Sequence, residues 1–298
     1  MDVVKIFDSF ISGGFECGLV HHGFHDLLHS TKHTPQAKMR AHYQALSAAG
    51  IRTARDGLPP LHLISDRLAE AKLCDMQVIW DLSHYHRRDL GRNAGMVGLI
   101  ANGYHSQDDD FWICPMNEPQ FAPAINGDSY GDLVKEGFLN AERVAKNFKG
   151  AVKILTSNAV GDGFAIDDPF SSIADVIGIN VYPHLLRRPI SDVLIETHQK
   201  YGKPVMISET SWHDGFHEAD EIGVCTKGGW FDHVLSEMSD AYRKGVQVAG
   251  MCWYPIVDCP PWDNPIGERW SHGLIKEDLS LDPSLSSALQ QFNRAFEI

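Results

Sequence analysis

Glu118 and Glu209 are the residues of this sequence best placed for acid–base and nucleophilic chemistry. Each follows a short apolar run, Glu118 in Phe-Trp-Ile-Cys-Pro-Met-Asn-Glu-Pro and Glu209 in Pro-Val-Met-Ile-Ser-Glu-Thr-Ser-Trp. This pattern is typical of a buried strand that ends in a functional loop. Two carboxyl groups at the ends of different strands are the arrangement that glycoside hydrolysis requires.

The two carboxyl groups need different surroundings for that reaction. One must protonate the leaving oxygen, while the other attacks or stabilises an anomeric carbon that becomes oxocarbenium-like. Burial favours a proton on the acid, whereas a nearby arginine and hydrogen bonds keep the nucleophile ionised. Arg55, at the end of another apolar run, is the expected partner of Glu209.

Short apolar runs alternate with helix-like segments along the whole chain. The eight strand candidates are residues 10–15, 51–55, 76–80, 111–114, 152–156, 176–179, 205–207 and 248–253. Helices are expected at residues 35–49, 60–73, up to about 103, 130–148, 190–201, 230–244 and 283–296, with a short one between 156 and 176. Gly50 is expected to end the first helix, because glycine tolerates the left-handed cap conformation.

This alternation implies parallel strands, because a parallel return needs a crossover. Eight units in 298 residues predict an α/β fold, a single (β/α)8 TIM barrel, which typically takes about 250 residues. A doubly wound open sheet is the alternative, but the sequence has neither a Gly-x-Gly-x-x-Gly after the first strand nor a phosphate loop. No linker or repeat divides residues 1–298, so we expect one catalytic domain.

Barrel enzymes carry their chemistry at the C-terminal ends of the strands. The residues expected there are Glu16, Arg55, Asp56, Asp81, His84, Asn117, Glu118, Ser157, Asn158, Asn180, Tyr182, Glu209 and Trp253. Strand ends are often polar because they meet loops. That does not account for an arginine and two glutamates at the same end of a barrel that also carries aromatic residues there. Trp253 and Trp262 are candidates for stacking on a sugar, with core packing as the alternative for Trp253.

The sequence resembles the clan of (β/α) barrel retaining glycosidases that contains the family 1 β-glycosidases. The matching segments, in order, are Arg55, Trp80-Asp81-Leu82, Asn117-Glu118-Pro119, Asn180-Val181-Tyr182, Ile207-Ser208-Glu209-Thr210, and Trp253 to Asp258 followed by Trp262 and Trp270-Ser271-His272-Gly273-Leu274. The resemblance implies that Glu118 is the acid/base and Glu209 the nucleophile. It also implies that Asn117 contacts the sugar 2-hydroxyl, that Tyr182 holds Glu209, and that no cofactor is needed.

The segments that would contact the outer sugar hydroxyls depart from the family. Ile79 stands where the family has a histidine before Trp-Asp-Leu, and His84 is the candidate substitute. Glu16 is the expected replacement for the glutamine of the first strand, and Pro261 precedes Trp262 where the family tends to have a glutamate. We therefore expect a divergent relative, and these motifs indicate neither the sugar, its linkage and aglycone, nor the oligomeric state.

Composition and charge limit the partners and the compartment expected for this protein. A net charge of -13 argues against binding to nucleic acid or to anionic membrane surfaces. We see no apolar stretch long enough to span a bilayer and no signal-peptide pattern, and six scattered cysteines suggest buried thiols of a reducing cytoplasm. A group of histidines matches no metal-ligand spacing, so no metal is expected; it comprises His21, His22, His25 and His29.

The sequence thus favours a cytoplasmic retaining exo-β-glycosidase whose partner is a carbohydrate or glycoside. An endo-acting glycanase of the same clan is one alternative, which an open groove would distinguish from a closed pocket. A non-catalytic carbohydrate-binding protein on this fold is another, although the presence of both carboxyl groups weakens it. The altered outer contacts also leave open a lyase or isomerase that uses the same acid pair.

Overall fold

The computed structural model describes residues 5–15, 36–59, 61–84, 90–121, 123–124, 127–161, 166–212, 223–259, 271–285 and 289. The strands in these residues are β1 (Ile11–Phe15), β2 (Thr53–Gly57), β3 (Gln77–Asp81), β4 (Phe111–Cys114), β5 (Val152–Ile154), β6 (Asn158–Ala159), β7 (Ile177–Asn180), β8 (Val205–Thr210) and β9 (Val248–Trp253). They form one sheet in the order β5-β4-β3-β2-β1-β9-β8-β7-β6, and every pairing is parallel.

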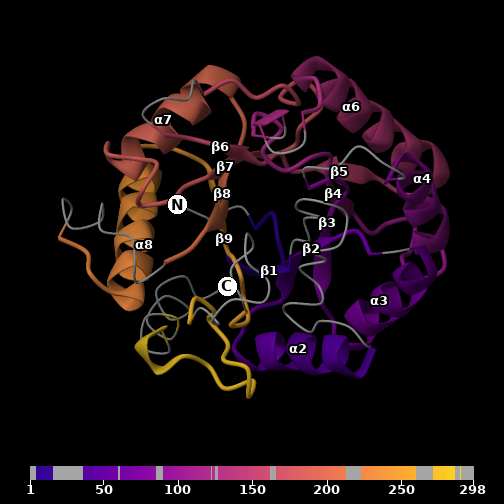
Figure 1. Ribbon diagram of the computed structural model, residues 1–298, viewed down its shortest axis with the longest axis horizontal. Helices are drawn as coiled ribbons and strands as arrows, with labels where there is room; N and C mark the ends of the chain where they lie inside the picture. Colours follow the sequence, from indigo (N-terminus) through magenta and orange to yellow (C-terminus); the bar gives the residue numbers. More distant parts are fainter. Residues whose placement is uncertain are drawn as a thin grey trace.

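The helices that connect the strands lie outside the sheet. They are α2 (Gln36–Ala48), α3 (Leu61–Leu73), α4 (Leu90–Ala101), α6 (Tyr130–Asn147), α7 (Ile190–Tyr201) and α8 (Lys227–Arg243). Figure 1 shows these helices as an outer ring around the strands. Among the helices in the described part of the chain, none combines the length and the apolar character needed to cross a membrane.

The sheet closes into a barrel through one interrupted strand. β5 pairs with β4, and β6 pairs with β7. Between them, Leu155 forms a parallel bridge with Val176, and the Thr156 N–H donates to the Val176 carbonyl at 3.1 Å. β5 and β6 are therefore two parts of the fifth barrel strand, and the predicted (β/α)8 barrel is confirmed.

Strand alternation divides the barrel interior into an apolar layer and a polar layer. Alternate residues of a strand face the same side, so Ile79 and Asp81 share a face, as do Met206 and Ser208. Ile79 and Met206 belong to a buried apolar cluster with Phe7, Trp112, Leu155, Val176, Ala249 and Cys252. On these two strands the polar residue comes two positions after the apolar one. The barrel interior therefore becomes polar toward the C-terminal ends of the strands.

Gly178 on β7 is required by the close approach of its neighbours. A Cβ atom there would lie 1.8 Å from the Thr156 carbonyl oxygen and 2.6 Å from Ser208 Oγ. Because backbone cannot yield as a flexible side chain can, only glycine fits. This places the Ser208 hydroxyl directly beside β7 and its end residue Asn180.

Several predicted boundaries shift. β2 begins at Thr53 and not at Ile51, because the Ile51 N–H still bonds to the Leu46 carbonyl at the end of α2. β8 continues to Thr210, since Glu209 pairs with Asn180 and Thr210 with Trp253. Gly50 has the predicted positive φ of 80°.

Two predicted helices fare differently. The short helix expected before residue 176 is absent from residues 166–175, which form turns. Of the closing helix expected at residues 283–296, residues 283–285 are helical and most of the remainder lies outside the described residues.

Candidate active site

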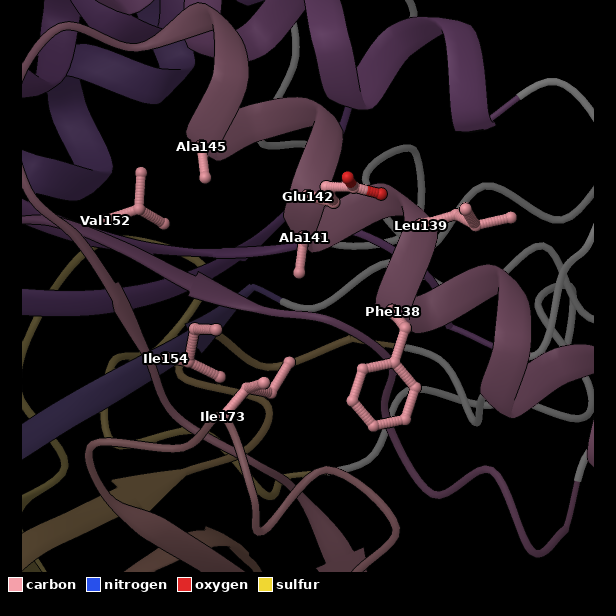
Figure 2. Close-up of a pocket in the computed structure, with 8 residues that line it drawn as sticks. All are labelled: Phe138, Leu139, Ala141, Glu142, Ala145, Val152, Ile154 and Ile173. Carbon is pink, nitrogen blue, oxygen red and sulfur yellow. The ribbon is translucent and has the colours of Figure 1, made fainter.

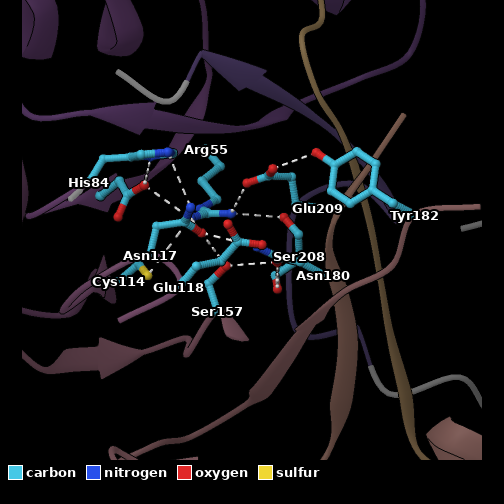
Figure 3. A network of polar contacts seen from close by, with 11 residues as sticks. Arg55, His84, Cys114, Asn117, Glu118, Ser157, Asn180, Tyr182, Ser208 and Glu209 are labelled. Carbon is cyan, nitrogen blue, oxygen red and sulfur yellow. Dashed lines mark hydrogen bonds and ion pairs between the residues drawn. The ribbon is translucent and has the colours of Figure 1, made fainter. Parts of the chain in front are cut away.

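Arg55 lies at the centre of the polar layer. Its Nη1 donates to Glu209 Oε2 at 3.3 Å and to the Ser208 carbonyl at 3.0 Å. Its Nη2 donates to Asp81 Oδ2 at 2.9 Å and to Asn117 Oδ1 at 2.7 Å (Figure 3). The guanidinium is fully buried, and its planar fork of donors holds these groups in fixed positions. The predicted contact between Arg55 and Glu209 is present.

Glu209 receives a second donor from the segment that follows β7. The Tyr182 hydroxyl donates to Glu209 Oε1 at 2.5 Å, and only 5% of Glu209 is exposed. Burial, followed by the nearby charges of Glu209 and Glu118, raises the pKa of Tyr182 well above its usual value. The phenol therefore stays protonated at neutral pH and remains a donor, so the two oxygens of Glu209 face a guanidinium and a hydroxyl.

Glu118 is held in an unusual backbone conformation. Its φ is 41°, in the left-handed region that few non-glycine residues occupy. Its N–H donates to the Ser157 carbonyl at 2.8 Å, and its Oε1 accepts from Asn180 Nδ2 at 2.9 Å. Strain of this kind is retained where the surroundings fix it, often at functional sites.

Because Glu118 has a positive φ, glycine should be better tolerated than alanine at this position, which is the opposite of the order expected in a helix. Glu118→Gly is expected to be more stable than Glu118→Ala by about 1 kcal/mol, since a Cβ is disfavoured in the left-handed region. Denaturant unfolding of both variants measures the difference. At Glu142, in the exposed face of α6, the order should reverse, because alanine is favoured in a helix by about 1 kcal/mol. An alanine variant at 118 as stable as the glycine variant would contradict the strain.

A hydrogen-bonded set of amides and hydroxyls joins the two glutamates. Asn180 Nδ2 also lies 3.1 Å from Asn117 Oδ1, and Asn180 Oδ1 accepts from Ser208 Oγ at 2.7 Å. Ser157 Oγ lies 2.7 Å from Asn117 Oδ1 and 2.8 Å from Asn180 Oδ1. The network therefore runs from Glu118 through Asn180, Asn117 and Arg55 to Glu209.

Sequence reasoning placed Ser157 at a strand end and Ser208 in the segment of Glu209, but it predicted neither the partners of these hydroxyls nor the contact of Asn180 with Glu118. The signal available was a polar residue in or just after an otherwise apolar run, as in Val-Met-Ile-Ser-Glu. That signal places a hydroxyl at a strand end but does not show which side chain it meets.

His84 follows β3, and its ring faces the same network. Its Nδ1 lies 3.3 Å from Asp81 Oδ2, and its Nε2 lies 3.2 Å from Asn117 Nδ2. Both ring nitrogens are thus engaged by protein groups, and the residue is 8% exposed.

Of the two tryptophan candidates for stacking on a sugar, Trp253 lies within the described residues. Trp253 has no exposed surface, donates from Nε1 to the His272 carbonyl at 2.7 Å, and packs against Phe231. It lies in the apolar core, and its stacking on a sugar stays a prediction. Glu16 and Trp262 lie outside the described residues.

No metal-binding group was found in the described ranges, where no three of the histidine, cysteine, aspartate and glutamate side chains converge suitably. The histidine group at residues 21–29 lies outside those ranges.

A cavity of about 360 Å³ lies between α6 and β5 (Figure 2). Apart from Glu142, its lining is apolar and comprises Phe138, Leu139, Ala141, Ala145, Val152, Ile154 and Ile173. It shares no lining residue with the polar network and offers no acid pair.

Comparison with known proteins supports the fold. No family model matches the chain, and no curated protein matches it in sequence. Among solved structures, a beta-glucosidase from Thermotoga maritima in complex with glucoimidazole aligns with a TM-score of 0.63 and 11% identity, over 97% of this chain and 99% of that one.

Two further structures are similar. The exo-beta-1,4-mannosidase from Opitutaceae bacterium strain TAV5 has a TM-score of 0.62 and 12% identity, over 96% of this chain and 59% of that one. GH5_18 from Streptomyces cattleya in complex with GlcNAc has a TM-score of 0.58 and 16% identity, over 96% and 81%. At such identities the likeness establishes the barrel fold, which this chain shares with glycosidases as the motif resemblance implied.

Proposed function

We propose that this chain is a retaining β-glycosidase of exo type and that residues 1–298 form one catalytic domain. The observation that carries the proposal is the setting of Glu209. Its nearly buried carboxylate accepts from the Arg55 guanidinium and the Tyr182 hydroxyl. Two such donors stabilise the ionised form, which is the form that attacks an anomeric carbon.

In the first step, Glu209 attacks the anomeric carbon while Glu118 protonates the leaving oxygen. The Glu209–sugar ester forms as the glycosidic bond breaks. In the second step, Glu118 takes a proton from water, which attacks the ester, and Glu209 is released as a carboxylate. Asn180, which donates to Glu118 Oε1, holds the acid/base in place for both steps.

Asn117 is proposed to contact the sugar 2-hydroxyl. Its Oδ1 already receives Arg55 Nη2 and Asn180 Nδ2, so that oxygen is occupied. Its Nδ2 carries two hydrogens, of which one points to His84 Nε2 at 3.2 Å. The other is the donor assigned to the sugar, where a hydrogen bond that strengthens in the transition state accelerates the reaction.

The exo action and the β-linked sugar of the proposal match what two comparison structures were named for. One was solved as a beta-glucosidase and another as an exo-beta-1,4-mannosidase. Cys74, Cys114 and Cys225 are free thiols, which suits the reducing cytoplasm proposed for the chain. Glu16, Trp253 and Trp262 remain proposed sugar contacts.

A panel of aryl glycosides that differ in sugar and in anomer tests the function. We expect turnover of at least one β-glycoside, with the β-anomer of the sugar as the first product detected by proton NMR. An α-anomer as first product would overturn retention. Absence of hydrolysis across the panel, together with sugar binding measured by calorimetry, would instead support a non-catalytic binding protein.

Exo action has a separate measurement. With β-linked oligosaccharides of increasing length, release of single sugars from the non-reducing end is expected. Release of internal fragments would favour the endo-acting alternative.

A further inference from the structure

The side-chain orientation of Asn117 is fixed by Arg55. The atom of Asn117 that lies 2.7 Å from Arg55 Nη2 must be the oxygen, because a guanidinium only donates. The same oxygen lies 3.1 Å from Asn180 Nδ2, another donor. The Asn117 nitrogen therefore faces His84. If the amide were flipped, its nitrogen would face the donor groups of Arg55 and Asn180.

This orientation determines the tautomer of His84. The amide nitrogen of Asn117, 3.2 Å from His84 Nε2, can only donate. His84 Nε2 must therefore accept and carry no proton. In the neutral ring the proton is then on Nδ1, which lies 3.3 Å from Asp81 Oδ2. One arrangement satisfies both contacts.

Asp81 and the backbone hold the imidazole in place. Asp81 Oδ2 accepts from Arg55 Nη2 at 2.9 Å and faces His84 Nδ1. His84 forms a parallel bridge with Asn117, and the Asn117 N–H donates to the Ser83 carbonyl at 2.8 Å. The segments after β3 and β4 are thereby joined through both backbone and side chains.

We propose that His84 is a positioning residue that aims the Asn117 amide at the sugar 2-hydroxyl, as the middle member of an Asp81–His84–Asn117 chain. The catalytic part of this inference rests on the proposed function. His84 would act through Asn117 and not by binding an outer hydroxyl, which the sequence had suggested. Without an acceptor at Nε2, the Asn117 nitrogen loses the contact that sets its direction.

The tautomer can be measured without any substrate. Protein labelled with ¹⁵N-histidine is examined by NMR at neutral pH, and the His84 signals are assigned by their loss in His84→Gln. We expect a protonated Nδ1 and an unprotonated Nε2. A proton on Nε2 would overturn the proposal whether or not the chain is a glycosidase.

The catalytic part is tested with 2,4-dinitrophenyl β-D-glucoside and its 2-deoxy analogue. His84→Leu is expected to lower kcat/KM for the glucoside roughly 10- to 100-fold, as small misplacements do, and to affect the 2-deoxy analogue much less. His84→Gln should recover part of the loss, because its amide oxygen can accept from Asn117. Equal losses on both substrates would overturn the proposal.

Two controls separate this test from folding and from the proposed function. His198→Leu removes a ring whose Nδ1 lies 2.8 Å from the Lys203 carbonyl on the outside of the barrel, and its kcat/KM should not change. Thermal unfolding identifies a destabilised His84→Leu protein, in which case His84→Gln and the NMR result decide. If the unaltered protein does not hydrolyse the glucoside, the same pair of substrates is made with the sugar of the aryl glycoside panel that it does hydrolyse. Failure across the whole panel counts against the glycosidase assignment, and the tautomer still decides the structural part.

Discussion

Glu209→Gln is expected to lower kcat on any glycoside substrate by roughly 10⁴-fold or more, the scale seen when a nucleophile is removed. Glutamine has nearly the same shape but is neutral and cannot form the glycosyl ester. The fold should survive, because Arg55 keeps Asp81, Asn117 and the Ser208 carbonyl as partners. Steady-state kinetics with an aryl glycoside and thermal unfolding together measure both outcomes.

The matched control is Glu196→Gln. Glu196 is an exposed glutamate of α7 that pairs with Arg188 at 2.8 Å, and surface pairs of this kind contribute little. Its kcat should equal that of the unaltered protein. Retention of most activity in folded Glu209→Gln would show that another group is the nucleophile.

Glu118→Ala is expected to have an effect that depends on the leaving group. A poor leaving group needs the proton that Glu118 supplies, so kcat/KM should fall by roughly 10²–10⁴-fold, the usual contribution of general acid–base catalysis. A 2,4-dinitrophenolate leaves without that proton, so kcat/KM for its glycoside should change far less. Its kcat should nevertheless fall, because Glu118 must also activate the water of the second step.

Azide distinguishes the base from the acid role. This anion attacks the glycosyl ester without giving up a proton, so it should restore turnover of Glu118→Ala and yield a β-glycosyl azide. Glu142→Ala, on the exposed face of α6, should show neither the loss nor the rescue. Equal losses for both leaving groups, without rescue, would remove Glu118 from the acid/base role.

The barrel could be predicted because its pattern is carried by local sequence. The strands at residues 111–114 and 248–253 were predicted at their observed bounds, since each is a short, largely apolar run. Boundaries failed where tertiary contacts decide. Ile51 is apolar and precedes Thr53, yet its N–H completes the end of α2.

The site was predictable as far as residue type determines a partner. A carboxylate on a barrel rim needs a cation, and Arg55 was identified as that of Glu209 from residue type, whereas Tyr182 was identified through the motif resemblance. The bond from Asn180 to Glu118 was not, because an amide can face many neighbours and only the geometry between β4 and β7 selects one. Trp253 shows the converse, since tryptophan suits both a sugar platform and the core, and residue type alone does not choose between them.

The most direct measurement is covalent trapping of the nucleophile. The protein is treated with 2-deoxy-2-fluoro glycosides of the sugars it hydrolyses, each bearing 2,4-dinitrophenolate as leaving group, and its peptides are analysed by mass spectrometry. We predict time-dependent inactivation and one fluoro-sugar mass added at Glu209. An adduct on another residue would contradict a double displacement through Glu209. So would hydrolysis of the corresponding glycosides that carry a 2-hydroxyl when no fluoro sugar forms an adduct.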